Sequence, residues 1–215
     1  MGTRSEAVRK AASVVRVAAA GVAVAGCAST GPQVQAWNPA PVGTSWEAVQ
    51  RNTGSFGKDT RTKSTRLEDA TWKGAKVVAV KGGAGVMLQN PGDGRWLALL
   101  SPDGKPAVTF DPPAGWTYPM AVGTTWGGKR SVFNVASGKT TEYTTDCKVD
   151  AYEKVTVAAG TFDAFRVHCA SSMDTDETYW LSPSVHPFLK TKIVRGAKNP
   201  SGGGTQETEL IKAPS

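Results

Sequence analysis

The chain has 215 residues, and 25 basic against 18 acidic residues give it a net charge of +7. Four bases and one acid lie within residues 1–16, so the remainder is only mildly and evenly basic, which does not indicate binding to nucleic acid. The length is ample for a hydrophobic core. Two histidines and three cysteines leave little material for a metal centre, and we expect no metal and no cofactor.

Residues 1–26 have the layout of a signal peptide. A basic stretch precedes Val17–Ala25, a run of nine apolar or glycine residues without charge. This run is far too short to cross a bilayer as a helix. The segment therefore predicts export and removal of the leader.

The apolar run ends in Val24-Ala25-Gly26-Cys27, which resembles the lipobox of bacterial lipoproteins. In that family an aliphatic residue, two small residues and a cysteine direct acylation of the thiol and cleavage just before it. The resemblance implies a palmitate-type anchor on Cys27 and attachment to a membrane of the cell envelope. Neither Ala28 nor Ser29, the two residues after Cys27, is acidic, so the outer membrane is expected where two membranes exist. The alternative is an ordinary secretory signal cut near Ala25.

Residues 27–41 are rich in proline and in small or polar residues, and they lack apolar periodicity. Such a composition is typical of a flexible segment. We interpret it as a tether between the lipidated Cys27 and a folded body.

The rest of the chain contains an internal repeat. "PVGTSW" at 41–46 recurs as "AVGTTW" at 121–126, and "LSP" at 100–102 recurs at 181–183, with offsets of 80 and 81 residues. This spacing predicts a duplicated module rather than a solenoid, with one β repeat over 42–118 and a second over 119–215.

Within both repeats the chain alternates short β-like runs with turns. Runs such as "KVVAV", "RWLALL" and "TYWL" are separated by "NPGDG", "SPDGKP" and similar turns. "SWEAVQR" fits a helix or a strand equally well, and "TQETELIK" would close the last hairpin. We predict an all-β fold, a duplicated antiparallel meander that forms a curved sheet, a half-barrel or a sandwich.

Cys147 and Cys169 form an even pair once Cys27 is acylated, and an exported chain favours their oxidation. Both fall on the apolar face of two strand-like runs joined by Ala158–Gly160. A three-residue loop would set Val149 opposite Cys169 and leave Cys147 on the diagonal. We therefore predict a disulfide together with an irregularity between the strands; two buried free thiols are the alternative.

The second repeat also carries a family resemblance. "EKVTVAAGTFDAFRVHC", followed by "ETYWLSPSVHPFLKTKI", resembles an uncharacterised family of bacterial envelope β-domains with a V-T-V-P-A-G-T-F hairpin. Ala158 stands where that family usually has proline. The resemblance implies a curved antiparallel sheet that wraps an apolar groove, and it brings no enzymatic activity.

Two short motifs suggest ion or phosphate binding only weakly. "GTTWGGK" at 123–129 nearly fits a phosphate-binding loop, but Arg130 replaces the required hydroxyl and no helix is expected to follow. Asp174, Asp176 and Glu177 lack the ligand spacing of a calcium loop. We interpret these three acids as a solvated turn.

The two histidines offer little for catalysis. His168 should face outward, because its neighbours belong to the apolar face, and a hydrolase would need His186 with Ser182 or Ser184 and a distant acid. We expect no enzymatic activity, and a hydrolase is the least favoured alternative.

The seven tryptophans are the remaining lead to function. Trp46 and Trp126 occupy matching places in the two repeats and suggest core positions. Trp72, Trp96 and Trp180 could instead stack on a ligand, although core packing is the more common use of such rings. We expect a non-catalytic binding or structural module at the membrane surface with a lipid-like or protein ligand in an apolar groove. A carbohydrate-binding module for envelope polysaccharide is the alternative.

Overall fold

The computed structural model describes residues 31–185 and 188–215, so Cys27 and His186 lie outside the described residues. Thirteen β-strands and one short 3-10 helix make up this described part of the chain. No helix within it is long and apolar enough to span a membrane. The predicted all-β class is confirmed, and "SWEAVQR" lies in a strand.

The strands follow one another with short connections. Their bounds are β1 (Ser45–Asn52), β2 (Thr60–Arg66), β3 (Ala70–Trp72), β4 (Ala75–Gly82), β5 (Gly85–Gln89), β6 (Trp96–Leu100), β7 (Pro106–Ala114), β8 (Thr125–Asn134), β9 (Lys139–Val157), β10 (Gly160–Ser171), β11 (Thr175–Leu181), β12 (Phe188–Arg195) and β13 (Gly204–Lys212). The 3-10 helix η1 spans Gly54–Phe56.

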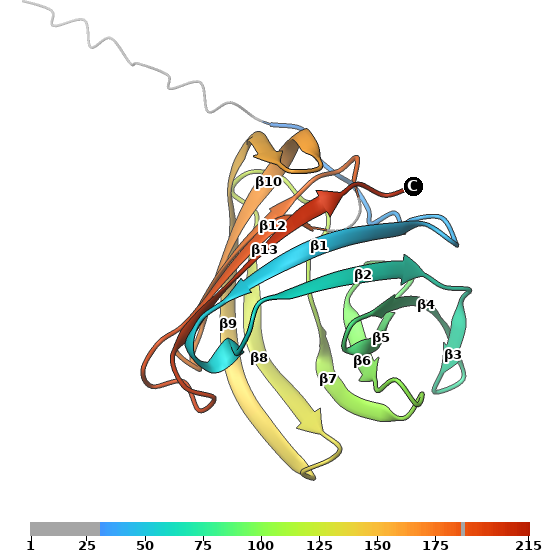
Figure 1. The fold of residues 1–215 in the computed structure, drawn as a ribbon, viewed down its shortest axis with the longest axis vertical. Coiled ribbons are helices and arrows are strands. Elements are labelled where there is room, and N and C mark those ends of the chain that lie inside the picture. Colours follow the sequence, from blue (N-terminus) through green and yellow to red (C-terminus); the bar gives the residue numbers. More distant parts are fainter. Residues whose placement is uncertain (1–30, 186–187) are drawn as a thin grey trace, which may run out of the picture.

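The sheet closes on itself (Figure 1). From β4 to β13 each strand pairs antiparallel with the next, β13 pairs with β1, β1 pairs with β2, and β2 pairs with β4 through Thr65–Lys81 and Arg66–Val80. Twelve strands of the described chain thus form a closed barrel, and β3 pairs only with β4. The prediction of a half-barrel or sandwich is wrong because pairing of the first strand with the last removes the open edges.

The duplication and the boundaries at 42–118 and 119–215 are not tested by this architecture. Strands from both halves belong to one continuous sheet. The repeat therefore stays a prediction.

The main core lies inside the barrel, where alternate residues of each strand point inward. Its centre is formed by Trp116, Met120, Val149, Phe165, Val167, Cys169 and Tyr179, all less than a tenth exposed. A second cluster, which includes Leu67, Trp72, Val77, Ala79 and Leu88, lies on the outer face of β4 and β5. β3 and the residues before it cover that face, as the curled right-hand part of Figure 1 shows.

The long hairpin of β9 and β10 determines how the cysteines meet. Its loop has two residues, not three, because Val157 pairs with Gly160. A bulge between Arg166 and Val167 shifts the register by one more residue. Together the two shifts set Cys147 directly opposite Cys169, with Val149 opposite Val167 rather than Cys169.

The disulfide between Cys147 and Cys169 is present. The expected irregularity between its strands is confirmed by the bulge. The tip of the same hairpin reaches β13, since the N–H of Ala159 donates to the carbonyl of Leu210 at 3.2 Å.

Candidate functional site: two cavities in the barrel

The barrel interior holds two cavities. Cavity 1, of about 390 Å³, is lined by residues of β1, β2, β4 and β5 and by the segment before β1. Cavity 2, of about 540 Å³, is lined mainly by residues of β8 to β13. Trp96 and Trp116 line both cavities and therefore form the wall that the two share.

Cavity 1 is mostly apolar. Its lining includes Trp46 of β1, Met87 of β5 and Phe165 of β10, together with Met120 and Phe188. Strands β2, β4 and β5 add Thr62, Ser64, Val78, Val80 and Gln89.

Among the described lining residues of cavity 1, one carries a charge. The guanidinium of Arg66 donates to the carboxylate of Asp69 and to the carbonyl of Leu67, so its charge is compensated within the protein. Burial raises the pKa of Tyr118, also in the lining, to about 12 and keeps it neutral. Cavity 1 therefore suits a neutral, apolar occupant.

The segment before β1 closes one side of cavity 1. Val34 and Met120 form a two-way backbone bridge, with N···O distances of 2.9 and 2.8 Å. Residues 36–40 also line the cavity, and the ring of Trp37 lies against Gly94 so closely that an added Cβ would meet it at 2.6 Å. Residues 31–40 are thus part of the folded body, in contrast to the tether expected over 27–41.

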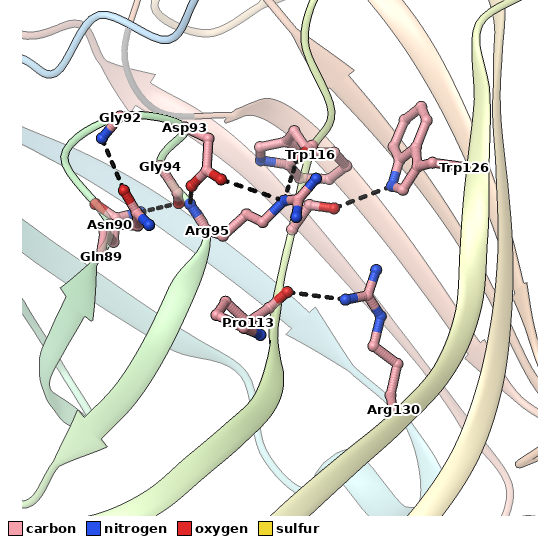
Figure 2. A network of polar contacts seen from close by, with 11 residues as sticks. Gln89, Asn90, Gly92, Asp93, Gly94, Arg95, Pro113, Trp116, Trp126 and Arg130 are labelled. Atoms are coloured by element: carbon pink, nitrogen blue, oxygen red, sulfur yellow. Dashed lines mark hydrogen bonds and ion pairs between the residues drawn. The ribbon is translucent and has the colours of Figure 1, made fainter.

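Three side chains hold the wall between β7 and β8 (Figure 2). These strands pair only through Val108–Asp111 and Ser131–Asn134, so the carbonyls further along β7 need other donors. The Arg130 guanidinium donates to the carbonyl of Pro113 at 2.8 Å, and the Trp126 indole N–H donates to that of Gly115 at 3.0 Å.

The third donor comes from the turn between β5 and β6. Nε of Arg95 donates to the carbonyl of Trp116 at 3.1 Å, which ties this turn to the wall shared by both cavities. The Asp93 carboxylate fixes the backbone of Arg95 by accepting a hydrogen bond from its N–H at 3.0 Å. The ring of Trp116 then packs edge-on against Tyr179, with centroids 4.8 Å apart.

Residues that are paired across neighbouring strands form one wall of cavity 2. One row of directly paired residues crosses six neighbouring strands, and all its members line the cavity: Trp126, Cys147, Cys169, Glu177, Ile193 and Gln206. The disulfide therefore forms part of the cavity wall. Arg130 and Tyr143, a cross-strand pair on β8 and β9, lie in the lining as well.

Cavity 2 contains perturbed titratable groups. The Tyr179 hydroxyl donates to the Glu177 carboxylate at 2.6 Å, and burial raises the pKa of both groups. Burial also raises the pKa of Tyr143 and lowers that of Arg130. The interpretation of Glu177 as part of a solvated turn is wrong, because it shares the inward parity of Tyr179 on β11.

The three candidate stacking tryptophans lie in different places. Trp96 lines both cavities, whereas Trp72 lies on β3 beside an outer groove, with the Lys73 ammonium 5.8 Å from its ring. Trp180 is on the outside of β11, where its indole donates to Glu153 at 2.9 Å and Lys190 covers its ring. The structure does not bring these rings together on one surface.

The remaining candidates form no catalytic arrangement within residues 31–185 and 188–215. His168 is exposed, as expected, and its Nε2 lies 2.6 Å from Asp176 on the outer surface. The hydroxyls of Ser182 and Ser184 bond to each other at 3.0 Å. No group of three or more metal-ligating side chains occurs in the same ranges.

Comparison with known proteins assigns no family. No family description and no curated protein matches the chain. Solved structures with similar folds include a candidate lipoprotein from Parabacteroides distasonis, at 13% identity and a TM-score of 0.44 over 84% of this chain and 99% of that one. A candidate exported protein with a YmcC-like fold from Bacteroides fragilis is 13% identical, with a TM-score of 0.45 over 83% and 99% of the two chains. The hypothetical lipoprotein YmcC from Escherichia coli is 10% identical, with a TM-score of 0.44 over 82% and 90%.

Sequence reasoning did not identify most of the cavity residues. Tyr143 stands in a strand without any motif, and Arg130 drew notice only as the residue that breaks the phosphate-loop pattern of 123–129. Glu177 did carry a signal, because Thr175, Glu177, Tyr179 and Leu181 alternate with outward residues along one strand.

Proposed function

We propose that the protein is a non-catalytic binding protein of the cell envelope that holds a lipid-like ligand in cavity 1. The apolar lining of this cavity, with its single charge compensated by Asp69, is the observation that supports this function. Its volume of about 390 Å³ falls in the range of small-molecule sites. Each methylene of an acyl chain buried there contributes about 0.8 kcal/mol.

The proposed anchor adds a geometric argument. Gly31 follows Cys27 by four residues, and even a fully extended chain of this length reaches only about 14 Å. Because Val34 already lines cavity 1, acylation of Cys27 would keep this cavity close to the membrane surface. A carrier or sensor of acyl chains needs such proximity.

A fluorescent fatty acid, cis-parinaric acid, tests the assignment. Ala48 of β1 lines cavity 1, and Ala48→Phe would fill part of its volume. We expect the wild type to bind the probe and Ala48→Phe to bind it at least about tenfold more weakly. Ala170→Phe, at an exposed position of β10, is the matched control and should bind as the wild type does.

Circular dichroism and thermal melting establish that each variant folds. Ala48→Leu provides a milder filling substitution if phenylalanine overpacks the barrel. A wild type that does not bind the probe, or equal binding by folded Ala48→Phe, would contradict the proposal.

The same geometry gives less support to the alternatives. A surface carbohydrate module would use a row of exposed rings, and Trp72, Trp96 and Trp180 do not form one. A protein ligand would need an exposed apolar surface, and the large exposed hydrophobic residues of the described chain are few: Val42, Val122, Phe133 and Val135.

Mass spectrometry of the protein from native membranes tests the anchor separately. Alkylation without reduction should leave a mature chain that begins at Cys27, carries acyl groups and takes up no alkylating agent. A soluble chain cut elsewhere, with an alkylated Cys27, would rule out the lipid anchor but not the ligand of cavity 1.

A further inference from the structure

Cavity 2 differs from cavity 1 in chemistry as well as in position. Three charged side chains line it, Arg130, Glu177 and Arg195, along with the hydroxyl of Tyr143 and the amides of other residues. Within the described residues, an acyl chain in this cavity would leave the Tyr143 hydroxyl without a partner and Arg130 and Glu177 with one side-chain hydrogen bond each, which is unfavourable. Cavity 2 therefore calls for a polar ligand.

Aromatic rings also line cavity 2. Trp96, Trp116 and Trp126 line it together with Phe110 and Tyr143. The Trp126 ring is held by its bond to Gly115, and Trp116 and Trp126 pack edge to face with centroids 6.3 Å apart. Such fixed rings can cover the C–H face of a flat, otherwise polar molecule without loss of rotamer entropy.

The polar groups are placed to make hydrogen bonds with a ligand. Within residues 31–185 and 188–215 the Tyr143 hydroxyl makes no hydrogen bond, and Arg130, directly across from it, uses only Nη1. Glu177 receives one bond from Tyr179 and has no salt bridge in the same part of the chain. Hydrogen-bond donors and acceptors on β8, β9 and β11 therefore all face cavity 2.

The charges that line cavity 2 further restrict the class of ligand that it can bind. Two guanidinium groups against one carboxyl disfavour a cationic ligand, although the rings alone could suit one. The hydroxyl groups of a ligand can donate hydrogen bonds to Glu177 and accept them from Arg130. A carboxylate on the same ligand can pair with one of the two arginines.

We infer that cavity 2 is a second binding site, for a saccharide, and that it favours a sugar bearing a carboxylate. This site is independent of the lipid-like ligand proposed for cavity 1. Its rings and polar groups are inside the barrel, so it differs from a carbohydrate module built on surface tryptophans.

Titration calorimetry with glucuronic acid and glucose on the full mature chain tests the inference. We expect saturable binding at millimolar concentrations, with glucuronic acid the tighter ligand. Tyr143→Phe removes one hydroxyl and should weaken binding about fivefold. Tyr118→Phe, the same change in the lining of cavity 1, should leave sugar binding unchanged.

A second pair of variants tests the carboxyl. Glu177→Leu should abolish measurable binding, whereas Glu142→Leu, at an exposed position of β9, should not alter it. The inference would be overturned if neither sugar showed saturable binding. It would also be overturned if all four variants bound the sugar with equal affinity. Parinaric acid binding by Tyr143→Phe reports on cavity 1 alone, so failure of one site is distinguishable from failure of the other.

Discussion

Removal of the Cys147–Cys169 disulfide should destabilise the barrel by an amount that follows from the length of the loop that the bond closes. The bond closes a loop with a sequence separation of 22. Loop-closure entropy for this length corresponds to about 3 kcal/mol at 25 °C. The double variant Cys147→Ala/Cys169→Ala should therefore lose about 3 kcal/mol in its free energy of unfolding.

Urea unfolding followed by tryptophan fluorescence measures this loss. In a domain of this size the same change corresponds to a fall in Tm of roughly 6–12 °C. Wild-type protein treated with a reductant should unfold like the double variant, and the variant itself should not respond to the reductant.

A loss below about 1 kcal/mol would refute the reasoning. The entropic value assumes that β9 and β10 separate in the unfolded chain. Their hairpin has a two-residue loop and a ladder that extends over both strands, so residual hairpin structure is the physical alternative. A normal loss of stability combined with unchanged sugar binding would also show that the bond is not needed to shape cavity 2.

Three further substitutions test the interior. Burial raises the pKa of Glu177, so the stability of the wild type falls as the pH rises through that pKa. Glu177→Gln should therefore be more stable than the wild type at neutral pH. The urea midpoints of the two proteins should converge below pH 4.5, the ordinary pKa of a glutamate. Gly94→Ala should lower Tm and expose residues 31–40 to protease, because Gly94 has a φ of 70° and its Cβ would collide with Trp37. Asp69→Asn should lower the urea midpoint at neutral pH, since buried Arg66 would lose its counter-charge.

Local patterns in the sequence predict much of the fold. Alternation of apolar and polar residues places strands in both halves of the chain and turns both Cys147 and Cys169 inward. The hairpin of β9 and β10 is also local, so its bulge could be expected from the mismatch between the loop and the cysteine positions.

Closure of the sheet is not a local property. It depends on β1 meeting β13, strands that lie at opposite ends of the folded chain, and on only two residue pairs between β2 and β4. Neither contact leaves a motif in the sequence. The same holds for residues 31–40, whose composition is that of a linker although Val34 and Trp37 have partners on the barrel.

The number of strands explains why this protein has cavities at all. An eight-stranded barrel is narrow enough for its own side chains to fill, whereas barrels of sixteen or more strands enclose a channel. The twelve strands of the ring described here fall between these cases. Trp96 and Trp116 divide the interior, and residues 34–40 close one side of it, yet two spaces remain unfilled.

These two spaces acquire different chemistry from the strands around them. Cavity 1 faces β2, β4 and β5, whose inward residues are mostly apolar or uncharged, whereas cavity 2 faces β8 to β11, which turn Arg130, Tyr143 and Glu177 inward. Partly buried charges of this kind reduce stability unless they are paired. Since Glu177 and Arg130 make one side-chain hydrogen bond each within the described chain, a polar ligand that satisfies both is the arrangement in which their cost is offset.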